Sequence, residues 1–451
     1  MTQPDGTTVS YRNLISLVEK HAESLKSEII GGPKRIAIMY NHPFQQAISI
    51  LSALAAGHQV VPLTIHYGRE RCRFILSDSR PEMLLSDHDV RDWEFTIDES
   101  TTEVPSKDLA FLLYTSGTTG RPKGVMLSHQ NIISNLIGIE SYFSLSEQDR
   151  LLIIRPLTHA SALTGELLYA LTQGACIDFY SGALFPAKIV SHLQATSCTA
   201  LCLTPTLIYQ MMRSRPKVKL PNLRKIAISG ERLHSNMALQ LQNYLPHVQF
   251  FNVYGLTEAS PRVCYLHPDF FVSKAGSVGV PLPNVEVKIV SNSGDICPNG
   301  VIGELFVRGP NVMIGYWGEP SPRNLMDGWL CTGDLAYMDE DHFIYIVGRK
   351  DDMIIRGGVN VYPAEIEQVL LTHPLVHEVI VQGEPDPWYG QKICITVAGE
   401  PGLSEQEVAH ICRMYLEPYQ RPDRIFVVEG GLEKNAVGKT VRKRITDSIH
   451  G

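Results

Sequence analysis

Residues 114–129 read YTSGTTGRPKGVMLSH, and this stretch decides the fold. A continuous apolar run at residues 109–114 predicts a buried strand, which ends abruptly in a polar, glycine-rich loop. Phosphate oxygens require hydroxyl donors, close backbone approach and positive charge. We therefore predict a phosphate-binding loop made of Thr115, Ser116, Gly117, Thr118, Thr119, Gly120 and Lys123. It is not a Walker loop, because the lysine follows Pro122 outside the glycine arc.

Around this loop the sequence alternates between helical and strand patterns, which is typical of an α/β fold with a largely parallel sheet. Amphipathic helices are expected at residues 14–25 and 44–56, and short apolar strands at 35–39 and 60–63. The pattern continues with expected strands at 151–154, 198–203, 225–228 and 248–253. Open α/β sheets bind ligands at the carboxyl ends of their strands, so we expect the site there.

The carboxyl-terminal part of the chain changes character twice. Helical periodicity disappears between about residues 276 and 347, which predicts a β-rich subdomain. A charged run at 349–352 then marks the expected boundary between a domain at residues 1–349 and a smaller one at 350–451. The smaller domain is predicted to be α+β, with helices at 364–371 and 404–415 and strands at 378–381 and 392–397.

Composition excludes several classes of protein. A formal net charge of −7 provides no basic field for nucleic acid or anionic lipid. The amino terminus lacks a secretory pattern, and the most apolar early stretch, at 47–63, is too interrupted to span a membrane. The nine cysteines show neither zinc-site nor disulfide spacing. We therefore expect reduced thiols and a cytoplasmic location.

Taken together, the motif at residues 114–129 resembles the signature loop of the adenylate-forming superfamily. That superfamily includes acyl- and aryl-CoA synthetases, nonribosomal-peptide adenylation domains and firefly luciferase. The resemblance extends from about residue 11 to residue 445. It implies a large amino-terminal domain, built of βαβ sheets plus a β-rich subdomain, and a small mobile carboxyl-terminal domain. The implied activity is ATP-dependent activation of a carboxylic acid through an acyl-AMP.

A second motif follows the expected strand at 248–253. Glu258 comes after a glycine turn and has the carboxylate oxygens that a hard cation takes, although the residue alone favours a solvated loop glutamate. The resemblance implies that Tyr254 flanks adenine, that Thr257 contacts the α-phosphate and that Glu258 carries Mg²⁺. Asn252 and Gly255 of the same motif belong to the predicted nucleotide site.

Three further segments complete the implied nucleotide site. Asp334 follows a glycine turn and would accept both ribose hydroxyls, and Arg349 would be a second nucleotide contact. Gly230 and Glu231 resemble the segment beside adenine, although Glu231 could simply lie near a helix start. Asp351 matches the implied hinge between the two domains.

The implied catalytic residues lie far apart in the sequence. Lys439 belongs to a Gly-Lys-x-x-Arg motif, and the resemblance implies that it bridges the acid's carboxylate and the α-phosphate. His159 matches the position that lines the acid pocket, where amino-acid-activating relatives have an aspartate. A simple aryl or acyl acid without an α-amino group is therefore favoured. A histidine that only caps its own helix is the alternative.

The acceptor is expected to be a thiol from another molecule. Tyr419 and Arg421 resemble the element that holds the CoA nucleotide in aryl-CoA ligases, and Gly357 and Gly358 resemble the glycines that line the pantetheine path. Trp388 lies where related ligases place a tunnel aromatic. Coenzyme A is favoured over a phosphopantetheinyl carrier protein. A P-loop hydrolase and a non-catalytic ATP-binding protein are the alternatives from other classes.

Overall fold

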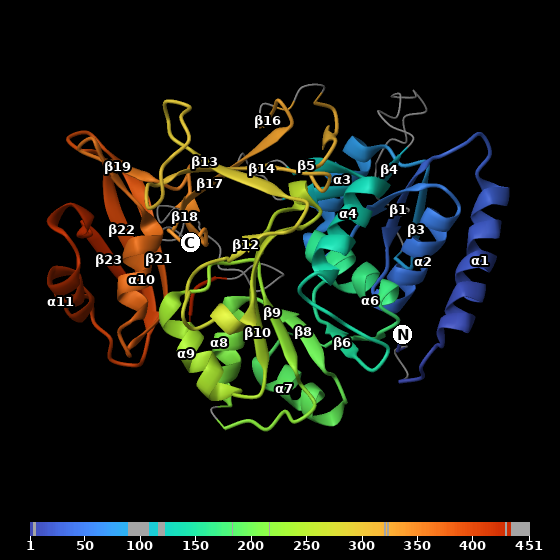
Figure 1. Ribbon diagram of the computed structural model, residues 1–451, viewed down its shortest axis with the longest axis horizontal. Helices are drawn as coiled ribbons and strands as arrows, with labels where there is room; N and C mark the ends of the chain where they lie inside the picture. The colour runs from blue at the N-terminus through green and yellow to red at the C-terminus, as the bar shows by residue number, and fades with distance from the viewer. Residues whose placement is uncertain are drawn as a thin grey trace.

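A computed structural model describes residues 1–2, 6–88, 108–115, 122–182, 184–215, 217–319, 322, 324–428 and 431–433. It is an α/β protein with four sheets among these residues, which confirms the predicted fold class. Figure 1 shows the four sheets arranged around the middle of the molecule, with α1 at one end and α11 at the other. None of the described helices is long and apolar enough to cross a membrane.

The amino-terminal sheet contains the predicted phosphate loop. Its six strands lie in the order β15-β5-β4-β2-β1-β3, and β3, β1, β2 and β4 are parallel. The polar loop follows β4, as the sequence predicts. The elements are α1 (Tyr11–Glu28), β1 (Arg35–Met39), α2 (Pro43–Ala55), β2 (Gln59–Pro62), η1 (Ile65–Tyr67), α3 (Arg69–Ser79), β3 (Met83–Ser86), β4 (Leu109–Thr115), β5 (Lys123–Ser128) and β15 (Gly315–Tyr316).

A seven-stranded sheet lies beside it, in the order β12-β11-β10-β9-β8-β6-β7, and β6 to β10 are parallel. Four of its strands match the four predicted ones. The strands are β6 (Arg150–Ile153), β7 (Cys176–Phe179), β8 (Ala200–Leu203), β9 (Lys225–Ile228), β10 (Gln249–Gly255), β11 (Arg262–Leu266) and β12 (Val280–Pro281). The helical elements are α4 (His129–Glu140), α5 (Ala160–Ala162), η2 (Leu163–Leu168), α6 (Tyr169–Thr172), α7 (Pro186–Ala195), α8 (Pro205–Ser214), α9 (Ser235–Tyr244), η3 (Thr257–Ala259) and η4 (Pro268–Phe270).

The predicted β-rich subdomain is an antiparallel sheet in the order β13-β14-β17-β16, with β18 paired to β17. Its strands are β13 (Glu286–Val290), β14 (Gly303–Arg308), β16 (Leu325–Met326), β17 (Trp329–Met338) and β18 (Ile344–Arg349). One strand of the same stretch, β15, instead pairs with β5 of the amino-terminal sheet. The pairing of β15 with β5 places Tyr316 next to the strand that begins at Lys123.

After β18 the chain forms a separate α+β unit with its own hydrophobic cluster. Its two long strands form an antiparallel hairpin, and β23 adds to β22 in parallel, a strand that the sequence did not predict. The predicted boundary after residue 349 falls between β18 and β19 and stays a prediction. The elements are β19 (Ile354–Arg356), β20 (Val359–Val361), α10 (Pro363–Leu371), β21 (Val376–Asp386), β22 (Gly390–Gly399), α11 (Glu405–Tyr415), η5 (Pro418–Gln420) and β23 (Arg424–Val428).

This unit packs against α8 and α9 through polar contacts. The Arg232 guanidinium donates to the Gln368 side chain at 3.0 Å, and Arg213 pairs with Glu400 at 2.8 Å. The backbone N–H of Leu432 donates to Glu378 at 2.9 Å, so the end of the described chain lies along the same interface. In this arrangement Gly357 and Gly358 are exposed at the turn between β19 and β20.

Candidate active site

Several of the predicted site residues lie at the carboxyl edge of the seven-stranded sheet. Ser229 and Gly230 follow β9, and Tyr254 and Gly255 end β10 (Figure 1). The neighbouring antiparallel sheet brings Asp334 of β17 to the same place, because the Tyr254 side chain contacts it. This is the edge at which open α/β sheets bind ligands.

Gly255 fits only as glycine. The strand pairing of β10 with β11 shifts register between Tyr254 and Gly255. A Cβ added at Gly255 would lie 1.7 Å from the carbonyl oxygen of Pro261. The absence of a side chain at Gly255 therefore lets its backbone pack directly against the backbone at Pro261. Gly255 lies between Tyr254 and Glu258, which are predicted to bind opposite ends of a nucleotide.

Asp334 is a buried carboxylate held by two donors. The Tyr254 hydroxyl donates to Oδ2 at 2.5 Å, and Arg349 Nη1 donates to Oδ1 at 3.0 Å. Asp334 and Arg349 are direct partners in the pairing of β17 with β18. Burial and then the nearby Asp334 charge raise the pKa of Tyr254, so it stays a neutral donor. The lone pairs that remain on Asp334 can accept further hydroxyl groups.

A second cluster joins Glu258 to Lys123. The Tyr316 hydroxyl donates to Glu258 Oε1 at 2.9 Å, and the Lys123 ammonium lies 4.7 Å from the centre of the Tyr316 ring. Glu258 is partly exposed. Mg²⁺ commonly binds one or two carboxylates, substrate phosphates and water, so a single glutamate is a sufficient protein ligand. Among the described residues, no group of three or more His, Cys, Asp or Glu side chains could hold a metal ion.

The predicted phosphate loop connects two antiparallel strands. Thr115 at the end of β4 is paired with Lys123 at the start of β5. The loop therefore differs from a P-loop, which leads from a strand into a helix. Several predicted residues lie outside the described part of the chain: Ser116, Gly117, Thr118, Thr119, Gly120 and Lys439.

Two other predicted nucleotide contacts, Glu231 and Asn252, have protein partners of their own. The Glu231 carboxylate accepts from the Thr206 hydroxyl at 2.6 Å and from the Thr206 backbone N–H at 3.3 Å, in the first turn of α8. The Glu231 side chain therefore contacts the start of α8, which precedes it in the sequence. It does not cap the helix that follows it, because α9 begins only at Ser235. The buried Asn252 amide donates to the Ser277 carbonyl at 2.7 Å. The nucleotide roles of Glu231, Asn252 and Thr257 stay predictions.

His159 lies directly before α5, and its side chain makes no capping hydrogen bond with that helix. Burial, followed by the charges of Arg155 and Arg71, lowers the pKa of His159 to about 4. The imidazole is therefore neutral at pH 7. The absence of a capping hydrogen bond argues against the alternative that His159 only caps its own helix. Its role in the acid pocket stays a prediction.

The structure adds a buried ion pair that the sequence reasoning missed. Arg155 Nη2 lies 2.7 Å from Glu166 Oε1, and Arg155 Nη1 donates to Ser229 Oγ at 3.2 Å. Burial raises the pKa of Glu166, but the adjacent guanidinium opposes that shift. A signal was present, because Arg155 and Glu166 are the only Asp, Glu, Lys or Arg residues between 151 and 177.

The predicted thiol-binding residues all lie on the small carboxyl-terminal unit. Trp388 is 89% exposed. Gly357 and Gly358 are also exposed. The Arg421 guanidinium donates to the Leu416 and Arg413 carbonyls, each at 3.2 Å, at the end of α11. Arg356, which was not predicted, supports this surface by donating to the Arg421 carbonyl at 2.7 Å.

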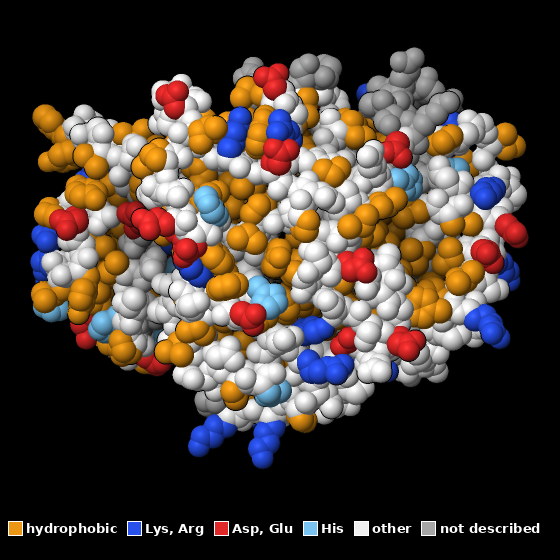
Figure 2. All heavy atoms as spheres, viewed as in Figure 1, with side chains coloured by type: hydrophobic (Ala, Val, Ile, Leu, Met, Phe, Trp, Pro, Cys, Tyr) orange, Lys and Arg blue, Asp and Glu red, His pale blue; other side chains and the backbone are white. Residues whose placement is uncertain are grey.

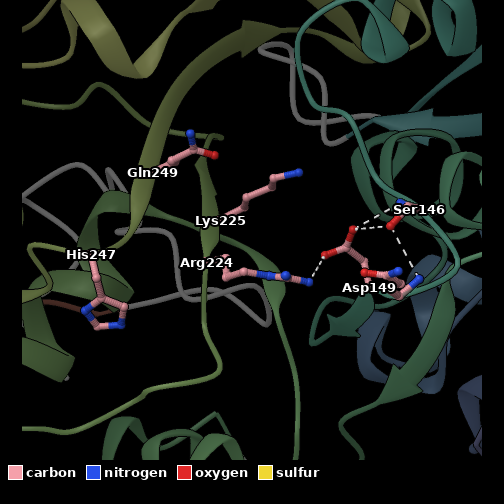
Figure 3. Close-up of a pocket in the computed structure, with 7 residues that line it drawn as sticks. Ser146, Asp149, Arg224, Lys225, His247 and Gln249 are labelled. Carbon is pink, nitrogen blue, oxygen red and sulfur yellow. Dashed lines mark hydrogen bonds and ion pairs between the residues drawn. The ribbon is translucent and has the colours of Figure 1, made fainter.

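An open hollow of about 330 Å³ lies at the opposite end of the seven-stranded sheet, beside the amino ends of β9 and β10. Figure 3 shows Arg224 and Ser146 turned toward Asp149 there, whereas His247 lies apart. Arg224 is 3.0 Å from Asp149 Oδ1, and the Thr199 hydroxyl donates to the same oxygen at 2.7 Å. The Asp149 carboxylate is thus hydrogen-bonded by its neighbours. None of the predicted site residues lines this hollow. On the face seen in Figure 2, basic side chains are scattered among acidic ones.

Replacing Gly255→Ala should destabilise the protein, because the new methyl group meets backbone that cannot move away. Overpacking of this kind costs about 1–3 kcal/mol or more. Gly348→Ala is the matched control, since a Cβ there has nothing within 4 Å. We expect a melting temperature several degrees lower for Gly255→Ala than for Gly348→Ala. Equal melting temperatures would contradict the close approach of the two backbones.

Replacing Asp334→Asn should weaken ATP binding while the protein stays folded. The amide keeps one acceptor but loses the charge that Tyr254 and Arg349 hold in place. We expect at least about a tenfold loss of affinity, as for a charge-assisted hydrogen bond. Calorimetric titration with ATP measures it, with the exposed Asp341→Asn as the charge-matched control. Equal ATP affinity of the two variants would remove Asp334 from the nucleotide site.

Known proteins show the same sequence pattern and fold. The family described as AMP-binding enzyme matches residues 1–317, and the AMP-binding enzyme C-terminal domain matches residues 365–439. A feruloyl-CoA synthase of an Amycolatopsis species is 32% identical, over 93% of this chain and 90% of its own length.

Two solved structures of o-succinylbenzoate CoA synthetase from Bacillus subtilis, each 28% identical, are also similar. The complex with the acyl-adenylate intermediate has a TM-score of 0.85 and covers 97% of this chain and 93% of that chain. The complex with ATP and magnesium ion has a TM-score of 0.86, with 98% and 95% covered. The chain therefore belongs to the family of AMP-binding enzymes, the adenylate-forming superfamily that its loop at residues 114–129 resembles.

Proposed function

We propose that this protein is an AMP-forming acid–thiol ligase that joins a carboxylic acid to coenzyme A. The observation that carries the proposal is the position of two polar clusters on either side of Gly255. Tyr254 leads to the Asp334 carboxylate, and Glu258 leads through Tyr316 to Lys123. One cluster suits a ribose and the other suits Mg²⁺ with phosphates, as ATP requires. Similar structures hold ATP, magnesium ion and an acyl-adenylate.

The reaction would proceed in two steps at one site. In the first, a carboxylate oxygen of the acid attacks the α-phosphate of ATP, and pyrophosphate leaves with its electron pair. In the second, the sulfur of the thiol attacks the acyl carbon and AMP leaves. Mg²⁺ on Glu258 would neutralise phosphate charge. Lys123 and Lys439 would add positive charge where negative charge develops, which is the largest source of catalysis in such sites.

The acid would lack an α-amino group. His159 is neutral at pH 7 and offers no carboxylate to an α-ammonium. Ferulate and o-succinylbenzoate, the acids named for the similar proteins, also lack that group. An aryl or acyl acid is therefore the proposed substrate class.

The thiol would be that of coenzyme A, reached through the carboxyl-terminal domain at residues 350–451. Gly357, Gly358, Tyr419 and Arg421 belong to that domain, and the glycines are exposed in the present arrangement. The domain would therefore turn about Asp351 between the two steps. A phosphopantetheinyl carrier protein presents the same arm and remains the alternative acceptor.

All nine cysteines are free thiols, which supports the proposed cytoplasmic location.

A panel of acids tests the function directly. Aryl, fatty, short-chain and α-amino acids are each supplied with ATP and Mg²⁺, and pyrophosphate exchange is measured. We expect exchange with one or more simple acids and none with amino acids. Adding coenzyme A should then give the acyl-CoA and AMP. A preference for an α-amino acid would contradict the acid assignment, and transfer only to a carrier protein would replace coenzyme A as the acceptor.

Replacing Lys439→Ala should separate the two steps. Losing one preorganised charge donor costs about a hundred- to a thousandfold in rate, so acyl-AMP formation should nearly stop. Transfer from supplied acyl-AMP to coenzyme A should stay close to the wild-type rate, because Lys439 would then lie away from the chemistry. ATP affinity should survive as well. Pyrophosphate exchange at a near wild-type rate would remove Lys439 from the first step.

A further inference from the structure

The buried pair of Arg155 and Glu166 lies at the functional edge of the seven-stranded sheet. Arg155 follows β6, and its partner Ser229 follows β9. Glu166 belongs to η2, a π-helical segment, and such segments are frequent at functional sites. Arg155 and Glu166 are 7% and 0% exposed. The proposed reaction uses neither of these charges.

A second arginine, Arg262, lies against Gly165, the residue directly before Glu166. A Cβ added at Gly165 would lie 3.1 Å from Arg262 Nη2, so the absence of a side chain there leaves room for this guanidinium. Arg262 begins β11 and is 3% exposed. Burial raises the pKa of Glu166, and the positive charges of Arg155 and Arg262 oppose that shift.

This cluster is incompletely hydrogen-bonded. Glu166 Oε1 is bound by Arg155, but Glu166 Oε2 is buried and has no hydrogen-bond partner among the described residues. The buried hydroxyl of Thr164, in the same π-helical segment, also lacks one. An ionised carboxylate oxygen can only accept a hydrogen bond. A buried acceptor without a donor is costly, so a group from outside this part of the chain fits the open position.

The partner of this carboxylate, Arg155, also acts on two segments of the proposed site. Arg155 contacts Ser229, directly before Gly230, and its charge also acts on His159. Glu166 is therefore connected through Arg155 to Ser229, the residue directly before the proposed adenine segment. A bound acid that extends past His159 would approach the carboxylate.

We propose that Glu166, positioned by Arg155, is a specificity-determining residue that accepts a hydrogen bond from a hydroxyl group of the acid substrate. This inference rests on the proposed function. The substrate class narrows to hydroxylated acids, since an acid with only hydrogen at that position leaves the buried oxygen unpaired. A site built to bind a substrate hydroxyl rejects the analogue that lacks it.

Matched acids test this preference. Benzoic and cinnamic acids are compared with their derivatives that carry a hydroxyl at position 2, 3 or 4, and hexanoic acid with 6-hydroxyhexanoic acid. In pyrophosphate exchange, we expect the wild-type protein to favour at least one hydroxylated acid over its parent by about ten- to a hundredfold in kcat/KM. Equal use within every pair would overturn the inference and leave the proposed function intact. No exchange with any acid would instead overturn the proposed function.

Variants then assign the preference to Glu166. The double replacement Arg155→Met with Glu166→Leu exchanges a buried ion pair for apolar side chains, which folded proteins often tolerate. We expect it to raise the KM for the hydroxylated acid to that of the parent acid and to leave the KM for ATP unchanged. A retained preference would overturn the inference, as would an equal loss of kcat/KM for every acid, which is what a purely structural pair predicts.

Glu166→Gln keeps the size of the side chain and one oxygen for Arg155, so it decides the question if the double variant does not fold. It removes the charge from the hydrogen bond with the substrate. We expect the preference for the hydroxylated acid to fall about tenfold, with the parent acid used as before. An unchanged preference in this variant would assign the hydroxyl to another group and overturn the inference.

Discussion

The buried carboxylate of Asp334 is the constraint on which the rest of the site depends. A buried charge is costly unless donors surround it, and Tyr254 and Arg349 supply them. Tyr254 comes from the seven-stranded sheet and Arg349 from the antiparallel sheet, so one carboxylate fixes the two sheets relative to each other. Arg349 also ends the last strand before the small carboxyl-terminal unit. The proposed ribose site and the proposed hinge at Asp351 therefore share one set of contacts.

The two ends of the seven-stranded sheet differ in how completely their polar groups are paired. At the amino ends, Asp149 is bound by Ser146, Thr199 and Arg224, although the surface there is hollow. At the carboxyl ends, Glu166 keeps a buried oxygen without a donor among the described residues. In a structural cluster, the charged groups form hydrogen bonds with one another. In a binding site, some donors or acceptors stay unpaired until the ligand binds.

Local patterns were enough to predict many of the helices and strands, although not β23, because strands that follow glycine turns and helices with one apolar face carry their signals within a few residues. A family resemblance in the sequence also led to the prediction of Tyr254, Glu258 and Asp334 as site residues. The sequence could not supply contacts between distant segments, such as Tyr316 with Glu258 or Arg155 with Ser229, since no local pattern records them. Nor does residue type alone reveal that the Arg421 guanidinium is engaged by carbonyls at the end of α11.

The central claim is that a carboxylate oxygen of the acid attacks the α-phosphate of ATP. An acid labelled with ¹⁸O in both carboxylate oxygens tests it, when supplied with ATP, Mg²⁺ and coenzyme A and followed by mass spectrometry of the products. The mechanism predicts AMP that carries one ¹⁸O atom and pyrophosphate that carries none, because the attacking oxygen stays on phosphorus when the thiol displaces AMP. Label in inorganic phosphate together with ADP, or AMP without label, would contradict the mechanism.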